Sequence, residues 1–493
     1  MELSAATLLF LSLLSVIILF SLLGRKPTPS SRKRQPPGPR RLPFIGSLLH
    51  LLTATLQVTL RDLARKHGPL MCLRLGQVDT VVISSPAAGE EVLQDNNLNF
   101  ASRLSLLSME TVCYGNTDIA FAPYGAYWRT FAWKVRQFAP IRDSETLSLI
   151  SNIRAAAGGS GEPVNLGKLL VSCTNTITAK VTFGDGCDAE LQERFLSVIW
   201  VVLDTSGRFC IGDLFPSLRF MDIVTGLQRR LWQARGQLDD VFNRIIAGCE
   251  AQRQEKETAA TTGDNDLLSV MLRIKEEGEL EFPIGTTNIK AIIVDLFTAG
   301  TEITSSIVEW IMSELMRNPA VMAKTQAEVR QTLDNKSPED HGGRMDKLEC
   351  TKMVIKEDMR LHPVVPLLLP RVCWDTCNIG GFEVSKGSRI MVNAWAIAGS
   401  PENWNDVDDG LQRHTFMYIP FRSGRRMCPG GTFGLAVLEL LLARLLYCFD
   451  WSLSDEIKPD DLDMGMIVGS TTRRRNQLHL VATPYNVPTE NRG

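Results

Sequence analysis

The stretch FRSGRRMCPG, residues 421–430, carries the most specific chemical signal in this chain. Its single cysteine, Cys428, stands among arginines and glycines and precedes a long apolar run from Thr432 to Cys448. Arginines and backbone N–H groups favour a thiolate, and a helix over the run would point its positive N-terminal end at the sulfur. Glycines let the backbone approach a flat ligand closely. A thiolate ligand to haem iron fits this setting best, while a buried structural cysteine before a helix is the alternative.

The spacing Phe-x-x-Gly-x-Arg-x-Cys-x-Gly is complete between Phe421 and Gly430, and here the chain resembles the cytochrome P-450 family of haem-thiolate monooxygenases. The resemblance extends to Thr472, because four motifs occur in the family's order. It implies a mainly α fold with a small β region, preceded by one N-terminal transmembrane helix. It also implies haem b as the cofactor, with Cys428 as the axial ligand of the iron and Arg426 as a partner of a haem propionate.

The composition excludes several other classes of protein. The 493 residues carry a net charge of −2, so nothing indicates a nucleic-acid partner. The eleven cysteines are scattered, and even the closest pair, Cys373 and Cys377, has no second pair or histidine cluster at the spacing of a zinc site. This usage is typical of a reducing compartment in which most thiols stay free.

An uncharged apolar run from Leu3 to Leu23 opens the chain, and five basic residues between Arg25 and Arg34 follow it. At ~1.5 Å per residue, such a run spans a hydrocarbon core of ~30 Å. The basic flank predicts a single-pass anchor in the endoplasmic reticulum membrane with the rest of the chain in the cytoplasm. A cleaved signal peptide is the alternative, but Met1 and Glu2 supply no basic region before the run.

The proline-rich segment QPPGPR, residues 35–40, predicts a stiff connection after the anchor. The chain therefore divides into an anchor at residues 1–24, a basic and proline-rich hinge at 25–45, and a haem-binding monooxygenase domain at 46–493.

Periodicity places the main elements of that domain. Residues 71–75 and 80–83 read as a β-hairpin around a glycine, and 86–95 as a short helix. Residues 99–118 have no clear period and predict a mobile loop, which in the family roofs the substrate pocket. Residues 143–278 are mostly helical by pattern, and 288–316 form a long apolar helix suited to the centre of the fold.

The second family motif lies at residues 121–129, where Trp128 corresponds to a tryptophan whose N–H binds a haem propionate. The family usually has a basic residue one turn later, but Ala132 stands there. Lys134 and Arg136 belong to a segment that the family places after a further piece of helix. By comparison with the family, the chain therefore lacks a short stretch here, and Arg136 is a candidate substitute for the missing base.

The third motif lies in the long helix, at AGTEIT, residues 299–304. Gly300 inside a helix costs about 1 kcal/mol against alanine, which indicates a close approach or a kink, and the resemblance makes it a candidate contact of the cofactor. In the family this is the oxygen-binding groove, where an acid is followed by a threonine. Glu302 is the acid and is expected to help deliver protons. Ile303 replaces the threonine, so the hydroxyls of Thr301 and Thr304 are the candidate catalytic ones beside Glu302.

The fourth motif is the pair Glu357 and Arg360, followed by a proline-flanked apolar stretch that ends at Arg371. The resemblance implies that the pair is buried behind the haem and that Arg371 meets a propionate. The family's Pro-Glu-Arg-Phe segment, which completes this network, is missing after Trp404, and Arg413 is the only nearby candidate to replace it. Arg422 also replaces a usual glycine in the cysteine loop.

The implied activity is oxidation of a hydrophobic small molecule with O2 and two electrons from NADPH, delivered by a cytochrome P-450 reductase. The segments FTAGT, residues 297–301, and LLLPR, residues 367–371, are similar to those of plant enzymes of specialised metabolism. This similarity indicates a terpenoid substrate, in particular a diterpenoid of a cereal. The expected pocket-lining stretches are Ile292 to Ala299, Val364 to Leu369 and Met466 to Ser470. Their one charged residue is Asp295, so they offer no partner to an anionic substrate.

Two other functions remain open from the sequence. A haem-thiolate isomerase or dehydratase acting on a peroxide would need neither a reductase nor the acid–threonine pair, and Ile303 fits it. A membrane-anchored relative that binds haem poorly would fit the missing segments. Peroxide consumption without reductase identifies the first, and failure to incorporate haem identifies the second.

Overall fold

The computed structural model describes residues 35–52, 55–135, 142–158, 161–184, 189–206, 210–258, 266–278, 282–334, 336–404, 416–421, 423–454, 457–468 and 471–485, with the single residues 15 and 280. The predicted anchor, Leu3 to Leu23, therefore lies outside the described residues, apart from one position. Two described helices are long and apolar enough to cross a membrane, Thr286–Arg317 and Gly431–Cys448, but more than half of each apolar window is buried inside the protein. Such burial is typical of core helices.

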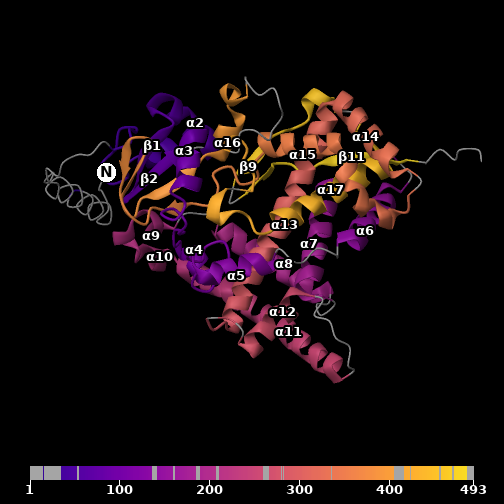
Figure 1. The fold of residues 1–493 in the computed structure, drawn as a ribbon, viewed down its shortest axis with the longest axis horizontal. Coiled ribbons are helices and arrows are strands. Elements are labelled where there is room, and N and C mark those ends of the chain that lie inside the picture. The colour runs from indigo at the N-terminus through magenta and orange to yellow at the C-terminus, as the bar shows by residue number, and fades with distance from the viewer. Residues whose placement is uncertain are drawn as a thin grey trace, which may run out of the picture.

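The described part is mainly helical and roughly triangular. In Figure 1 the strands β1 and β2 lie at one upper corner beside the start of the described chain, and the outline narrows towards α11 and α12 at the opposite end. The helices are α2 Leu56–His67, α3 Pro86–Glu90, α4 Leu107–Val112, α5 Ala126–Val135, α6 Arg142–Ala157, α7 Leu166–Phe183, α8 Ala189–Ser206, α9 Ile211–Leu214, α10 Met221–Val224, α11 Leu227–Thr258, α12 Leu267–Glu277, α13 Thr286–Arg317, α14 Pro319–Leu333, α15 Glu349–Leu361, α16 Ala394–Gly399 and α17 Gly431–Cys448.

The strands form one four-stranded sheet and three smaller ones. The strands are β1 Leu70–Leu75, β2 Val78–Ile83, β3 Val164–Asn165, β4 Arg371–Val372, β5 Cys377–Ile379, β6 Phe382–Val384, β7 Arg389–Val392, β8 Phe449–Ser452, β9 Met466–Val468, β10 Thr472–Arg474 and β11 His479–Pro484. The largest sheet has the order β1-β2-β7-β4 and the others are β3-β11-β8, β9-β10 and β5-β6. In the predicted hairpin Leu70 pairs with Ile83, which confirms β1 and β2.

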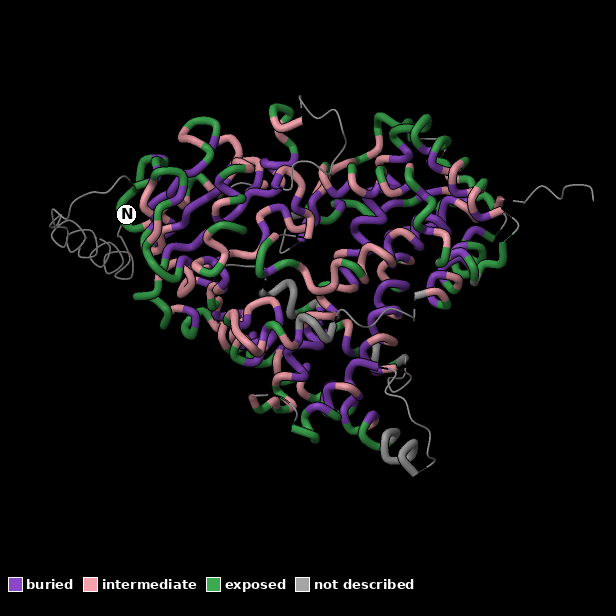
Figure 2. Tube along the Cα trace, viewed as in Figure 1, coloured by how far each residue is buried: buried purple, intermediate pink, exposed green. Residues whose placement is uncertain are grey.

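Helix α13 is the centre of the core, as the apolar pattern predicts. It begins after Gly285, whose N–H donates to the Asn288 side chain at 2.8 Å, and it ends before Pro319, which opens α14. Ile292 and Ile311 are fully buried, and burial of each such side chain contributes roughly 1.5–3 kcal/mol of transfer free energy. Figure 2 shows buried segments running through the middle of the molecule, where α7 and α17 also lie.

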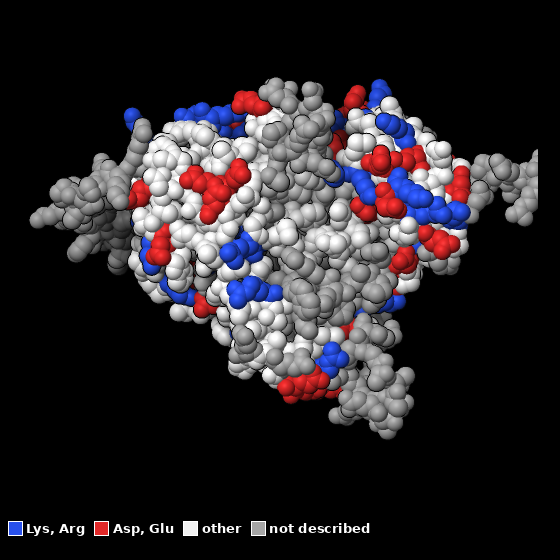
Figure 3. Space-filling view, in the orientation of Figure 1, with Lys and Arg blue, Asp and Glu red and all other residues white. Residues whose placement is uncertain are grey.

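The face of the molecule in Figure 3 shows no large patch of charges of one sign among the described residues. Basic and acidic side chains lie next to one another there, mostly near the corner formed by α14, and wide areas between them are uncharged. This mixed surface agrees with the net charge of −2.

Residues 99–118 differ from the expectation of a structureless loop. They contain α4, whose Leu107 and Val112 are buried, and a backbone bridge joins Arg103 to Arg371 of β4. A helix of six residues is shorter than two turns, so its sequence cannot display a helical period.

Candidate haem site

The loop around Cys428 is held by backbone contacts between a 3-10 turn, Gly424–Arg426, and α17. The Cys428 N–H donates to the Phe421 carbonyl at 2.9 Å. Gly424 has a φ of +70°, and a Cβ there would overlap the carbonyl oxygen of Leu93. Only glycine can adopt this positive φ and also fit where there is no space for a Cβ. The motif therefore folds tightly and presents Cys428 at the start of a helix.

The Cys428 side chain is half-buried and its sulfur makes no hydrogen bond within the described residues. Open space lies beside Gly430 and Gly434, because a Cβ added at either would meet no other atom within 4 Å. The N-terminal end of α17 favours an anion at this position. A thiolate ligand and a flat group close to the backbone both fit this surface.

One face of α13 is open although the helix lies in the core. Ala299 is exposed, and Asp295 and Ile303, one turn away on either side, are half-buried. Ile303 packs against the same hydrophobic cluster as Phe421 and Phe433 from the cysteine side. The exposed side of α13 and the cysteine loop thus border the same hydrophobic cluster, the arrangement that a haem group between them needs.

Three groups predicted to bind propionates converge from distant parts of the sequence. The Arg426 guanidinium is buried and donates to the carbonyls of Ala101 at 2.7 Å, Ile119 at 3.3 Å and Ala122. The Trp128 indole also donates to the Ile119 carbonyl, at 3.0 Å. Arg371 is buried and donates to the Phe100 carbonyl at 3.2 Å. These three side chains thus donate to backbone carbonyls of one region of the chain, those of Phe100, Ala101, Ile119 and Ala122.

These buried donors suit the two carboxylates of a haem, because a charge-assisted hydrogen bond to a carboxylate is stronger than one to a carbonyl. Their binding of propionates remains a prediction. Sequence reasoning missed one member of this group, Arg103, which donates to the carbonyls of Ala120 at 3.1 Å and Leu369 at 2.7 Å. A lone arginine in an irregular stretch gave no signal that it would be buried.

Glu302 lies three residues beyond the first of the stretches expected to line the pocket. Its carboxylate is buried and accepts a hydrogen bond from the Thr471 hydroxyl at 2.7 Å. The neighbouring Thr472 N–H donates to the Val364 carbonyl at 2.7 Å. Thr471 lies one residue beyond the range predicted from the sequence, and its hydroxyl gives Glu302 a partner that can pass a proton.

A model of the cytochrome P-450 family matches residues 36–480. The chain belongs to the cytochrome P-450 family. As a member of it, this P-450 is a monooxygenase that binds haem through a cysteine thiolate. Cys428 is the cysteine that we assign to this role, from its position in the motif and in the fold.

The similar proteins include plant enzymes with related names. Cytochrome P-450 99A2 of Oryza sativa subsp. japonica is 57% identical, with 98% of this chain and 94% of the relative covered. The 9-beta-pimara-7,15-diene oxidase of the same plant is 56% identical, with 98% of both chains covered. Premnaspirodiene oxygenase of Hyoscyamus muticus is 41% identical over 98% of this chain and 100% of the relative. A zebrafish cytochrome P-450 structure with progesterone has a TM-score of 0.73 at 22% identity, covering 88% and 100%, which shows the fold.

The remaining residues of the oxygen-groove motif face away from the open side of α13. A Cβ on Gly300 would lie 2.7 Å from the Thr178 hydroxyl of α7, so this glycine permits two helices to approach closely. The Thr174 hydroxyl of α7 donates to the Thr301 carbonyl at 2.9 Å. Thr301 and Thr304 are both buried. The geometry therefore does not favour these two hydroxyls as replacements for the missing threonine of this P-450, nor Gly300 as a contact of the cofactor.

Glu357 and Arg360 form the predicted pair, with two hydrogen bonds of 2.8 and 2.6 Å. The implied burial is wrong for Glu357, whose side chain is 50% exposed. Arg360 instead has further partners on its other side: it donates to the Ala398 carbonyl at 2.9 Å, and its guanidinium lies 5.2 Å from the centre of the Trp404 ring. Trp404 thus stands where a third partner of the pair is needed.

The predicted departures around Arg136, Arg413 and Arg422 lie outside the described residues, as does the side chain of Ala132. The alignment with cytochrome P-450 99A2 spans 510 positions, more than the 493 residues of this P-450, so the relative contains residues that this chain lacks.

Proposed function

We propose that this P-450 hydroxylates a diterpene hydrocarbon or a lightly oxygenated diterpenoid, using O2 and electrons from NADPH that a cytochrome P-450 reductase delivers. The observation that carries the proposal is the 56% identity with 9-beta-pimara-7,15-diene oxidase over 98% of both chains. Identity at this level over the full length makes a related substrate class the natural expectation.

The described surroundings of the open α13 face support an apolar substrate. Leu296, Ala299 and Ile303 present only hydrocarbon there, and Phe297 packs in the cluster behind them. The charged residue of this face, Asp295, accepts hydrogen bonds from two backbone N–H groups at 2.7 Å each. A substrate without charge therefore matches the pocket better than an ionised one.

Each residue of the site has a defined task in this proposal. Haem, when bound, supplies the activation of O2 and the transfer of an oxygen atom. Cys428 holds the iron, and Arg371, Arg426 and Trp128 hold the propionates. Glu302, which accepts a hydrogen bond from the Thr471 hydroxyl, helps to pass protons next to the open face of α13.

We also propose that residues 3–23 anchor the protein in the endoplasmic reticulum membrane, with the catalytic domain in the cytoplasm. The uncharged run and the basic residues after it support this orientation. Protease added to intact microsomes should digest the catalytic domain, and full protection would show that the orientation is wrong.

The test of the activity is turnover in microsomes that contain the full chain and a plant cytochrome P-450 reductase. We expect 9-beta-pimara-7,15-diene to yield a product one oxygen heavier that requires NADPH and O2, with microsomes carrying Cys428→Ser as the control. Turnover of charged, amino-acid-like compounds and of no diterpene would refute the substrate class.

One observation favours a second candidate, an isomerase or dehydratase of organic peroxides. Ile303 puts a hydrocarbon side chain on the open face of α13 where the family has a threonine, and such chemistry needs no delivered proton. Rapid consumption of an organic hydroperoxide without NADPH or reductase, together with no diterpene oxidation, would establish it.

A further inference from the structure

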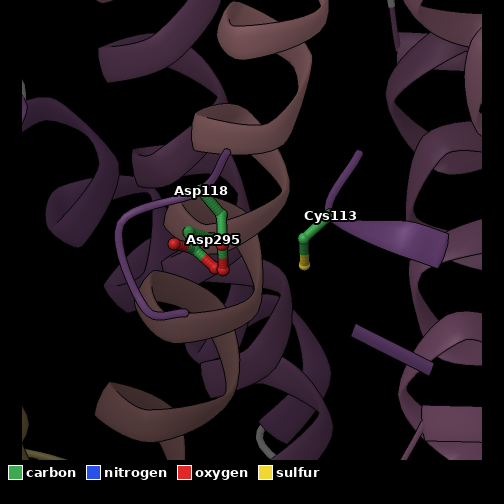
Figure 4. Close-up of side chains that lie close together, drawn as sticks. All are labelled: Cys113, Asp118 and Asp295. Carbon is green, nitrogen blue, oxygen red and sulfur yellow. The ribbon is translucent and has the colours of Figure 1, made fainter. Parts of the chain in front are cut away.

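Two carboxylates lie together beside the open face of α13: the half-buried Asp295 from that helix and the buried Asp118 from the loop that follows α4. Figure 4 shows Asp118 and Asp295 pointing towards each other, with the sulfur of Cys113 across a gap from them. The ligand atoms of these three residues all lie within 4.8 Å of one another. Asp118 is completely buried, so water does not screen its charge.

Asp295 fixes the backbone of the facing loop. Its Oδ2 accepts hydrogen bonds from the N–H groups of Ile119 and Ala120, both at 2.7 Å. Two such donors favour the charged form of a carboxyl group. Asp295 stands one turn before Ala299 on the open face of α13, so the two amides place the loop directly beside the pocket.

Asp118 lacks comparable donors. Its Oδ2 accepts one hydrogen bond, from the Phe121 N–H at 3.2 Å, and its Oδ1 has no donor in the described part of the chain. Burial and the neighbouring Asp295 raise the pKa of Asp118 well above its ordinary value. Burial likewise raises the pKa of the Cys113 thiol, so the third group stays neutral. Two carboxyl groups this close do not readily ionise together, and the two N–H donors on Asp295 favour a proton on the side of Asp118.

The same segment is held from its other side by groups of the haem site. The Ile119 carbonyl accepts from Trp128 and Arg426, and the Ala120 carbonyl accepts from Arg103. The N–H groups of these two residues thus point at Asp295, while their carbonyls point at donors expected beside the propionates. A shift of Asp295 would move the pocket wall relative to the cofactor.

We propose that Asp118 and Asp295 share one proton, and that Asp295 is a positioning residue which sets the place of the Ile119–Ala120 wall and thereby selects the carbon that is oxidised. The part about selectivity rests on the proposed function. The part about the shared proton and the wall does not, so the two are tested by separate measurements.

The first measurement needs no substrate: hydrogen exchange by mass spectrometry on the ligand-free, haem-loaded protein. In Asp295→Ala, the Ile119 and Ala120 amides should exchange at least about tenfold faster, because each loses a hydrogen bond to a charged group. Asp118→Asn supplies the donor that a protonated acid would supply, so it should exchange much less rapidly than Asp118→Ala. Unchanged exchange in Asp295→Ala would overturn the proposal.

The matched control is Asp222→Ala. Like Asp295, Asp222 accepts from two backbone N–H groups, those of Ile211 at 2.9 Å and Gly212 at 2.8 Å, but it is fully buried and lies on α10. Asp222→Ala should speed hydrogen exchange at residues 211–212 and leave exchange at Ile119 and Ala120 unchanged.

The shared proton is tested by infrared spectroscopy. An infrared difference spectrum should show the carbonyl band of a protonated carboxylic acid in the unmodified chain and lose it in Asp118→Asn. A divalent cation bound in equal amount to the protein, and lost in Asp118→Asn, would overturn the shared proton.

The second measurement is the ratio of positional isomers formed from 9-beta-pimara-7,15-diene. Asp295→Ala should spread oxidation over more carbons, Asp118→Asn should keep the ratio close to that of the unmodified chain, and Asp222→Ala should keep it even if the protein is less stable. An unchanged ratio in Asp295→Ala, in a protein that still turns over the diterpene, would refute the selectivity role. Absence of turnover in the unmodified chain would instead refute the proposed function.

Discussion

The two sides of the haem site differ in how closely they follow the family pattern. On the cysteine side, the Phe-x-x-Gly-x-Arg-x-Cys-x-Gly spacing from Phe421 to Gly430 is complete, although Arg422 replaces a usual glycine within it. Gly424 and Arg426 hold this loop against the residues before α5. On the α13 side, Glu302 is present but Ile303 replaces the expected threonine. We propose that this site keeps the residues that hold haem and is altered at the residues that deliver protons.

This difference separates two functions of a haem site, the ligation of the iron and the delivery of protons. Iron ligation depends on a sulfur and on buried cations, whereas proton delivery depends on hydroxyls and carboxylates on the opposite side. Changes on the cysteine side should therefore abolish haem–thiolate binding and turnover. Changes on the α13 side should alter only the amount of product formed per NADPH.

The largest expected effect is that of Cys428→Ser. It removes the soft anion at nearly constant volume, so the reduced, carbon monoxide-bound protein should lose the thiolate spectrum and turnover should cease. Cys350→Ser is the control, because Cys350 is a half-buried cysteine on α15. Retention of the thiolate spectrum in Cys428→Ser would mean that another residue binds the iron.

The next effect distinguishes two adjacent arginines. Arg426 is buried and donates to three carbonyls, whereas Arg425 is exposed and donates to Asn97 and Tyr124. Arg426→Ala should lower haem content and the free energy of unfolding, by roughly 1–3 kcal/mol for each buried carbonyl left unsatisfied. Arg425→Ala should change either by much less. Equal effects, measured by haem absorbance and thermal unfolding, would contradict the assigned role of Arg426.

A pH titration sharpens the account of the α13 side. The pKa of Asp118 is raised in the folded protein, so between its unfolded value of ~3.9 and the raised value the folded state binds the extra proton. The contribution of Asp118 to stability should therefore fall as the pH rises, by up to about 1.4 kcal/mol per pH unit. Asp118→Asn should lack this slope, so the unfolding free energy of the unmodified chain minus that of the variant should fall as the pH rises. A difference independent of pH would show that Asp118 is not protonated in the fold.

The parts of the fold predicted correctly were those with local signals. The helix at residues 288–316, the hairpin of β1 and β2, and the helix after Cys428 each have a pattern that lies within a single segment. The short helix α4 was missed, because six residues cannot display a helical period.

The contacts of the site were harder to predict because they join distant residues. Thr471 reaches Glu302 across 169 positions, and Arg103 reaches Leu369 across 266. Nothing in the neighbourhood of Thr471 or Arg103 in the sequence indicates such a partner. The family resemblance named Trp128, Arg371 and Arg426, but it did not indicate that all three would meet the backbone of the same loop region.

The measurement that tests the central claim most directly compares NADPH consumed with product formed, in the unmodified chain and in Ile303→Thr. If the two sides of the site are separable, the unmodified chain should waste electrons as peroxide or superoxide, and Ile303→Thr should raise the product per NADPH several-fold. The thiolate spectrum should be the same in both proteins, because Cys428 is untouched. Tight coupling in the unmodified chain, with no gain from the threonine, would contradict the claim that the altered side limits this enzyme.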